Sequence, residues 1–269
     1  MRHIPDILTG LRERAPLIHC ITNPISINQC ANAILALGGR PIMAEHPREV
    51  EEITATAGAL MLNLGNITAV RMDAMRLAAR TAAARGIPIL LDAVGVACSQ
   101  LRRDYVCELL SDVTPTVIKG NYSEINALCC ADYRASGVDA DGALDTPSMD
   151  RAATALAHRH GAVLLASGRV DVITDGTRLV HSKNGTPRLS GVTGTGCMLG
   201  ALTAACLSVS PDMDGAAAAC AVLGICGQLA ETERGSGSFM VGLLDALSTV
   251  DGAVIERYLD REEITIEAS

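Results

Sequence analysis

Short apolar runs alternate with longer segments of helical periodicity along most of this chain. The apolar runs predict buried strands at residues 17–21, 40–43, 59–63, 87–91, 116–119 and 162–167. Between them, apolar positions at helical spacing predict helices at residues 28–37, 48–57, 70–85, 99–110, 121–130 and 149–159. This alternation is typical of α/β proteins, so we expect a three-layer α/β/α fold with a mostly parallel central sheet.

The pattern changes after residue 169. VDVITDGTRLVH, residues 170–181, contains two β-rich runs around Asp175 and Gly176, a residue pair that favours a hairpin turn. We therefore expect an antiparallel hairpin at the edge of the sheet. Three apolar helices should follow, near residues 196–209, 213–231 and 239–258, and the polar tail DREEITIEAS should be frayed.

The chain shows no sign of division into separate domains. No linker rich in Pro, Gly or Ser interrupts the pattern, and no block of sequence repeats. We expect a single domain over residues 1–269. Residues 131–146 carry the weakest pattern, and they could form either an ordered excursion or a mobile lid.

Composition narrows the classes of partner. The net charge of -8 and the lack of a Lys/Arg run argue against a nucleic-acid partner. The ten cysteines fall mostly in apolar runs without CxxC spacing, which indicates reduced thiols rather than disulfides or a zinc site. The N-terminus has no apolar signal core, and the Ala-rich residues 215–230 are more typical of a buried helix than of a membrane span. We expect a cytoplasmic protein without a membrane partner.

A segment rich in glycine and threonine precedes the first of the three apolar helices. In SGVTGTGCMLGALTAAC, Thr193, Gly194, Thr195 and Gly196 come directly before the helical run. Glycines let backbone N–H groups approach an anion, and the start of a helix supplies unpaired N–H donors and a positive partial charge. Phosphate is the usual anion at such a site, but a glycine turn with a threonine cap is an equally good interpretation of this segment alone.

Three charged residues near the carboxyl ends of predicted strands could serve a phosphate or a metal. Asp92 ends the run ILLD, and Glu124 follows the turn in VIKGNYSEI. Two such acids at the usual ligand crevice of a parallel sheet could hold Mg²⁺. The alternatives are that Asp92 forms a turn and that Glu124 favours a helix start. Lys119 could contact a nucleotide phosphate or merely end a strand.

Four other residues could line a pocket for a small molecule. Asn23 in HCITN could bind a ligand or cap a helix, while Met43 and Gly65 follow apolar strands and could equally serve packing and turns. Cys197 is placed where the field of the helix favours a thiolate and a substrate hydroxyl would approach, although a small core residue is the plainer interpretation.

Together, HCITN, PIM, LNLG, LLDAVG, VIKGNYSEI, SGRVDVITDG and VTGTGCM resemble the hydroxyethylthiazole kinase family, a thiamin-salvage branch of the ribokinase-like superfamily. The resemblance runs from about residue 15 to 258, and GTGC is distinctive because most ribokinase-like enzymes carry Asp at the Cys position. It implies a ribokinase-like fold and transfer of the γ-phosphoryl group of ATP to the alcohol of 4-methyl-5-(2-hydroxyethyl)thiazole. It also implies a homotrimer with sites at subunit interfaces.

The resemblance further implies roles for individual residues. Mg²⁺ would be organised by Asp92 and Glu124. ATP would be contacted by Lys119, Ser167, Asn121 and Thr193. The thiazole would be contacted by Met43, Asn23, Gly65 and Gly194. Catalysis would use the backbone of Gly194, Thr195 and Gly196 together with Cys197, which would act as a base or only position the alcohol.

The sequence departs from the family pattern at several points. It reads DAVG for DPVG, KGN for RGN and SGR for TGE, and GSGSF lacks the usual proline. These changes bear on nucleotide affinity and substrate identity. The alternatives are a ribokinase-like kinase for another small alcohol, such as hydroxymethylpyrimidine or a sugar, and a thiazole-binding protein without turnover. An ATP-dependent dehydratase of damaged nicotinamide cofactor is disfavoured by Cys197.

Overall fold

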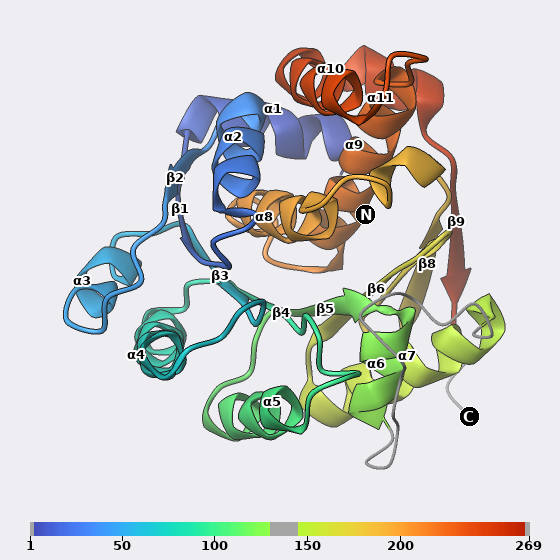
Figure 1. Ribbon diagram of the computed structural model, residues 1–269. Coiled ribbons are helices and arrows are strands. Elements are labelled where there is room, and N and C mark those ends of the chain that lie inside the picture. Colours follow the sequence, from blue (N-terminus) through green and yellow to red (C-terminus); the bar gives the residue numbers. More distant parts are fainter. Residues whose placement is uncertain (1–2, 130–144, 267–269) are drawn as a thin grey trace.

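The computed structural model describes residues 3–129 and 145–266, which build a nine-stranded sheet between two layers of helices (Figure 1). The strands are β1 (Leu17–Ile21), β2 (Arg40–Ile42), β3 (Ala59–Asn63), β4 (Ile89–Asp92), β5 (Val117–Asn121), β6 (Val163–Ser167), β7 (Asp171–Thr174), β8 (Arg178–Ser182) and β9 (Arg261–Thr265). The helices are α1 (Ile4–Arg14), α2 (Ile27–Leu37), α3 (Val50–Thr54), α4 (Ala69–Arg85), α5 (Gln100–Asp112), α6 (Tyr122–Cys129), α7 (Thr146–His160), α8 (Thr195–Leu207), α9 (Met213–Leu229), α10 (Ser236–Thr249) and α11 (Gly252–Tyr258).

The order of the strands predicts where a ligand would bind. The order is β2-β1-β3-β4-β5-β6-β7-β8-β9, and all pairs from β2 to β6 are parallel. The chain moves outward from β1 to β2 and then crosses back to β3, so the winding direction switches between β1 and β3. Ligands of such sheets bind outside the carboxyl ends of the strands near the switch point.

Helices cover both faces of the sheet. Helices α1, α2, α8, α9, α10 and α11 lie on one face, and α3 to α7 lie on the other (Figure 1). The first face is closed by a large core of Ile, Leu, Ala and Cys side chains, while two smaller cores lie under the second layer. Small residues bring α8 close to the sheet, because a Cβ on Gly200 would lie 2.7 Å from the Met61 side chain and 3.1 Å from Asp92 Oδ2. The expected three-layer α/β/α arrangement is confirmed.

The antiparallel edge is larger than the sequence predicted. Strands β7 and β8 form the expected hairpin, but β9 pairs antiparallel with β8 and is the outermost strand. The prediction of a frayed polar tail was therefore wrong for residues 261–265. The charged residues Arg261, Glu262 and Glu263 suit an edge strand that pairs through its backbone while most of its side chains face water.

Two helical predictions also need correction. The helix expected at 239–258 is two helices, because the chain turns at Val250 and the Asp251 side chain caps α11 by accepting from Val254 N. Helix α1 was not predicted. Within the described part of the chain no single helix is long and apolar enough to cross a membrane, and α10 and α11 reach that length only as a pair bent by 117°. Of the segment 131–146, residues 131–144 lie outside the described residues.

Candidate active site

A buried ion pair joins the carboxyl end of β4 to the middle of β5. Asp92 and Lys119 are register partners on adjacent parallel strands, so their side chains share a face of the sheet. Lys119 Nζ donates to Asp92 Oδ1 at 3.1 Å and to Oδ2 at 3.0 Å. Burial raises the pKa of Asp92. Burial would lower the pKa of Lys119, but the carboxylates of Asp92 and Glu124 outweigh it and raise the pKa.

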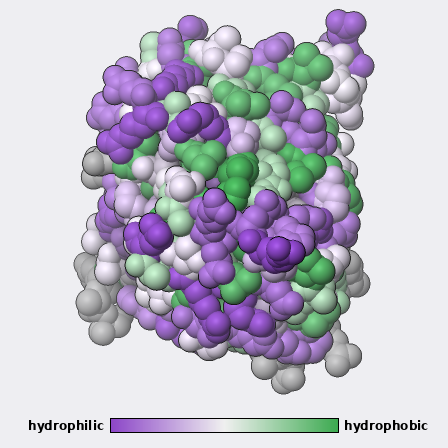
Figure 2. Space-filling model, turned by 90° about the vertical axis from the view of Figure 1, so that its left-hand side faces the viewer, coloured by the Kyte–Doolittle hydropathy of each residue, from purple (hydrophilic) through white to green (hydrophobic). Residues whose placement is uncertain are grey.

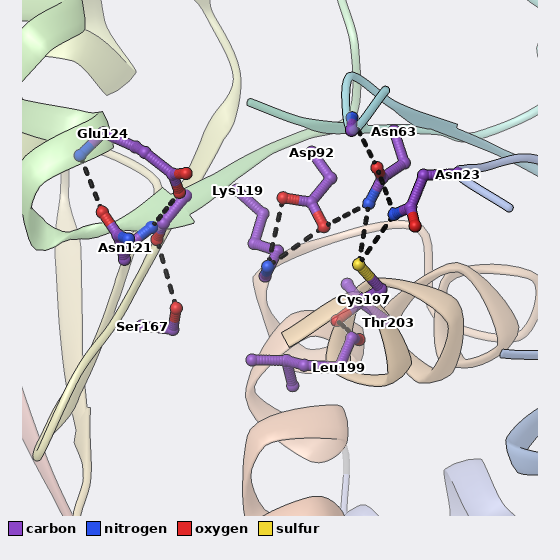
Figure 3. A network of polar contacts seen from close by, with 12 residues as sticks. Asn23, Asn63, Asp92, Lys119, Asn121, Glu124, Ser167, Cys197, Leu199 and Thr203 are labelled. Atoms are coloured by element: carbon purple, nitrogen blue, oxygen red, sulfur yellow. Dashed lines mark hydrogen bonds and ion pairs between the residues drawn. The ribbon is translucent and has the colours of Figure 1, made fainter. Parts of the chain in front are cut away.

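Asn63, at the end of β3, connects this ion pair to Cys197 (Figure 3). Its Oδ1 accepts from Gly65 N at 2.8 Å and from Asn23 Nδ2 at 3.3 Å. A backbone N–H can only donate, so the Gly65 contact fixes which end of the amide is the oxygen. Nδ2 of Asn63 therefore points the other way and donates to Asp92 Oδ2 at 3.1 Å and to Cys197 Sγ at 3.4 Å.

Asn23 orients its amide in the same way. Its Oδ1 accepts from Ile25 N and Ser26 N, both at 3.1 Å, which leaves Nδ2 to donate to Cys197 Sγ at 3.3 Å. Two amides whose orientations are fixed by backbone donors thus converge on one sulfur atom. Sγ is held as a hydrogen-bond acceptor at the start of α8.

The start of α8 leaves its backbone donors available. Gly194 is the N-cap residue with φ 96°, in the left-handed region that favours glycine, and no side chain of the described residues caps the helix. The Thr195 hydroxyl instead donates to Leu189 O at 2.6 Å and anchors the preceding loop. A Cβ on Gly196 would lie 3.8 Å from Lys119 Nζ, so the helix start adjoins the buried cation. This arrangement can bind an anion.

Glu124 and Asn121 form a capping box at the start of α6. Asn121 Oδ1 accepts from Glu124 N at 2.8 Å, and Glu124 Oε2 accepts from Asn121 N at 2.7 Å. Glu124 Oε1 also accepts from Gly95 N at 2.7 Å, which ties the turn after β4 to α6. Burial, and after it the charge of Asp92, raise the pKa of Glu124. Glu124 thus stands at the start of a helix, as the alternative interpretation of the sequence expected. Each of its carboxylate oxygens accepts one of these hydrogen bonds and can accept another.

The acidic residues fit a cation that is shared with a ligand. Among the described residues, no group of three or more His, Cys, Asp or Glu side chains could hold a metal ion alone. Mg²⁺ is usually bound through one or two carboxylates together with water and substrate phosphates. Asp92 and Glu124 match that mode, because both carboxylates are buried near the ends of the adjacent strands β4 and β5 and a divalent cation would stabilise their charges.

A cavity of about 880 Å³ lies beside the start of α8. It is lined by the turn between β6 and β7, by residues 183–190 and by α8 and α9. Ser167, Thr195 and Gly196 are the predicted site residues that line it. Asp171 also lines it, accepts from Gly168 N at 3.0 Å, and has its pKa raised to about 6 by burial. A cavity of this size suits a nucleotide-sized ligand.

The remaining predicted residues lie at the same edge of the sheet but outside this cavity. Met43 directly follows β2, is half-buried and packs against the large core. Gly65 follows β3, and a Cβ there would lie 2.7 Å from Asn23 Nδ2, so the network leaves no room for a side chain. Thr193 is exposed in the turn before α8.

Asn63 and Asp171 were missed by the sequence analysis. Asn63 ends the otherwise apolar strand ALMLN, and a polar residue at the carboxyl end of a buried strand is the signal that could have found it. Asp171 starts a strand after a turn, and nothing in its local sequence distinguishes it from an ordinary turn residue.

The three-layer fold, the anion-binding helix start and the adjoining cavity define a small-molecule kinase of the ribokinase-like class. A sequence model described as the hydroxyethylthiazole kinase family matches residues 8–252. The hydroxyethylthiazole kinase 2 of Clostridium botulinum is 44% identical over 256 residues, which cover 93% of this chain and 96% of that protein. This chain belongs to the hydroxyethylthiazole kinase family, as its motifs predicted.

Solved structures agree with this assignment. The structure of a hydroxyethylthiazole kinase protein from Pyrococcus horikoshii matches with a TM-score of 0.90 and 34% identity, and the match covers 98% of this chain and 100% of that one. A ribokinase-like superfamily protein from Enterococcus faecalis matches with a TM-score of 0.63 at 12% identity over 94% of both chains. The second match shows the shared fold alone.

Proposed function

We propose that this chain transfers the γ-phosphoryl group of ATP to the hydroxyethyl group of 4-methyl-5-(2-hydroxyethyl)thiazole, giving the thiazole phosphate and ADP. Family membership supports the reaction and the role in thiamin salvage. The observation that carries the proposal for this chain is the buried network of Asp92, Lys119, Asn63 and Cys197 at the uncapped start of α8.

The start of α8 is the proposed phosphoryl site. The backbone N–H groups of Gly194, Thr195 and Gly196 would stabilise negative charge on the transferring group, since phosphoryl transfer depends on positioning and electrostatics more than on covalent chemistry. Cys197 would lie beside the alcohol, with Sγ fixed as an acceptor by two amides. A Cys197 thiolate would take the hydroxyl proton and become the thiol, whereas a neutral thiol would serve only to orient the hydroxyl.

Asp92 and Glu124 are the residues that would hold Mg²⁺. When bound, the cation would supply neutralising charge to the phosphates. Lys119 would hold the Asp92 carboxylate in place through two contacts of 3.0 and 3.1 Å. Glu124 would hold the turn after β4 through Gly95.

The cavity is the proposed ATP site. Ser167 lines it, and its register partner on β5 is Asn121, so the two side chains proposed to contact ATP end adjacent strands. Lys119 lies two residues earlier on β5, next to Gly196. Thr193 is exposed beside the helix start, where it could meet a phosphate oxygen.

The thiazole alcohol would bind near the ends of β1, β2 and β3. Asn23 and Gly65 border the amide network, and Met43 offers an apolar side chain at the same edge of the sheet. Gly194 completes the set, because its missing Cβ leaves space beside Ser26. These residues would place the hydroxyethyl group between Cys197 and the helix start.

The domain count and the location belong to the same proposal. We expect one kinase domain, since strands from both halves of the chain share the sheet, and a cytoplasmic location, where ATP is the phosphoryl donor.

The proposed assembly is a homotrimer. It would cover hydrophobic surface on the side where β2, α2 and α4 lie, and Figure 2 shows this hydrophobic surface between hydrophilic patches. Ile25, Leu35 and Val70 are exposed large hydrophobic residues of that region. Light scattering should give about three times 28.0 kDa, and a monomer would contradict shared sites.

A substrate comparison tests the catalytic proposal. ADP formation should depend on Mg²⁺ and be selective for the thiazole alcohol over hydroxymethylpyrimidine and ribose. Turnover of another alcohol alone would retain the kinase class and overturn the substrate. Saturable thiazole binding without ADP formation would identify a binding protein that has lost turnover.

A further inference from the structure

Two buried side chains outside the amide network hold the segment that follows β2. We propose that His19 and Arg71 are positioning residues of the alcohol site, which clamp residues 43–45 against the sheet and against the turn after β3. This inference rests on the proposed function, because Met43 and Gly65 are the residues assigned there to the alcohol.

His19 fixes the first half of this segment from β1. Its Nε2 lies 2.9 Å from Ala44 O, and its Nδ1 lies 2.8 Å from the Thr54 hydroxyl at the end of α3. A carbonyl oxygen can only accept, so Nε2 carries the proton and Nδ1 of the neutral ring accepts from Thr54. Because the ring is completely buried, both contacts are made in an environment without competing water.

Arg71 fixes the second half from α4. Its Nε donates to Glu45 Oε2 at 2.6 Å, and its Nη1 donates to Asn66 O at 2.8 Å. The Arg71 side chain is 9% exposed, whereas that of Glu45 is 43% exposed. Asn66 has φ 48°, a left-handed conformation that is rare outside glycine, so its carbonyl is aimed by an unusual backbone. One planar guanidinium therefore links the segments after β2 and after β3.

The two contacts converge on the proposed alcohol site. Ala44 and Glu45 directly follow Met43, and Asn66 directly follows Gly65. None of these five residues is part of the lining of the large cavity, as far as the described residues form it. Helices α3 and α4 lie together on the face of the sheet opposite α8 (Figure 1), so the clamp reaches the site from the layer that does not carry the phosphoryl loop. Loss of the clamp should therefore weaken binding of the alcohol and leave binding of the nucleotide unchanged.

The test compares two pairs of variants, each of which removes an ion pair made by an arginine of α4. Glu45→Ala and Arg71→Met remove the clamp. Glu108→Ala and Arg76→Met remove the surface pair between Arg76 of α4 and Glu108 of α5, whose N to O distance is 3.0 Å. We expect the clamp variants to raise KM for the alcohol by about tenfold and to leave KM for ATP within about twofold. The control variants should leave both KM values within about twofold. Glu45 is partly exposed, so its variant should fold even if Arg71→Met does not.

His19 supplies a second and independent pair of variants. His19→Gln keeps a donor for Ala44 O, whereas His19→Leu has none. The rise in KM for the alcohol should be larger for Leu than for Gln, which a merely structural loss would not produce selectively. Equal changes in KM for the alcohol and for ATP, or no change in Glu45→Ala, would overturn the inference.

Hydrogen exchange separates failure of the clamp from failure of the proposed function. Without any ligand, Glu45→Ala should speed amide exchange in residues 43–45 and 65–66 relative to Glu108→Ala. A wild-type chain that turns over no alcohol would overturn the proposed function and the positioning role with it. Unchanged exchange in an enzyme that is active on the alcohol would overturn the clamp alone.

Discussion

Lys119 Nζ lies 3.0 Å from Asp92 Oδ2, although the two side chains expose only 4% and 0% of their surface. Each charge is tolerated in this apolar layer because the other is present, and Asn63 satisfies a further lone pair of Asp92. The pair stands between the start of α8 and the strand ends, so it sets the electrostatics of the proposed phosphoryl site.

Breaking this pair should cost stability as well as activity. Lys119→Met would leave the Asp92 carboxylate buried without its partner, and we expect the free energy of unfolding to fall by about 3 kcal/mol. Lys119→Arg keeps the charge and should lose less than half of that. Urea unfolding followed by circular dichroism measures the stability of both variants. A Met variant as stable as the wild type would show that Asp92 does not need Lys119 in the folded state.

Cys197→Ser should slow turnover and spare nucleotide binding. The C–O bond is shorter than the C–S bond, so the hydroxyl would sit farther from Asn23 and Asn63, which now lie 3.3 and 3.4 Å from Sγ. We expect kcat to fall by about tenfold or more and KM for ATP to stay within about twofold. Cys98→Ser, at an exposed cysteine, is the control. Equal kcat values for the two variants would remove Cys197 from the mechanism.

Asn63→Asp tests the amide that the sequence analysis missed. The substitution keeps an acceptor for Gly65 N but puts a carboxylate oxygen where Nδ2 donates to Asp92, so two anions would meet in a buried site. Turnover should fall by about a hundredfold or more, because the charge and the donor to Sγ change together. Asn32→Asp, at an exposed amide on α2, should keep full activity. Steady-state kinetics that failed to distinguish the two variants would contradict the network.

Asp171→Asn should stabilise the protein at high pH. Burial raises the pKa of Asp171 to about 6, so the native state holds this proton more tightly than the unfolded chain. The protonated Asp171 makes its full contribution to the free energy of unfolding below pH of about 4. This contribution is lost as the pH rises through about 6. The variant cannot ionise, so it should exceed the wild type by about 1–2 kcal/mol at pH 8 and by little at pH 4.

Asp175→Asn provides a control of opposite sign. Hydrogen bonds from Thr177 and Arg178 outweigh the effect of burial and hold the pKa of Asp175 at about 2. Its contribution is present above pH of about 4 and is lost as pH falls through about 2, so the variant should be less stable than the wild type at pH 8. Chemical unfolding at pH 4 and pH 8 measures the stability of both variants. Changes in the free energy of unfolding of the same sign for the two variants at pH 8 would contradict these assignments.

The fold was largely predictable because strong local patterns agree with the tertiary structure. The strands at 17–21 and 59–63 have the predicted bounds, since apolar runs of this length are buried on both faces. Helix α1 carries Ile4, Ile7 and Leu11 on one buried face, a helical spacing that the sequence analysis did not use. Strand β9 could not be found from its polar sequence REEIT, because only backbone pairing with β8 makes it a strand.

The candidate site was predictable only as separate pieces. Parallel strand ends explain why Asn23, Asp92 and Lys119 come together, and the glycines explain the start of α8. The contacts of Asn63 with Cys197, 134 positions away in sequence, depend on how α8 packs across the sheet, which no local pattern encodes. The clamp of His19 and Arg71 depends on loop conformations for the same reason.

Transfer of labelled phosphate tests the central claim most directly. Wild-type enzyme and Asp92→Asn, with folding checked by circular dichroism, would be incubated with Mg²⁺, thiazole alcohol and ATP that carries ¹⁸O in its γ-phosphoryl group, and the product followed by mass spectrometry. We predict labelled thiazole phosphate from the wild type and about a thousandfold slower formation by the folded variant. No labelled product from the wild type, or equal rates for the two proteins, would contradict the account.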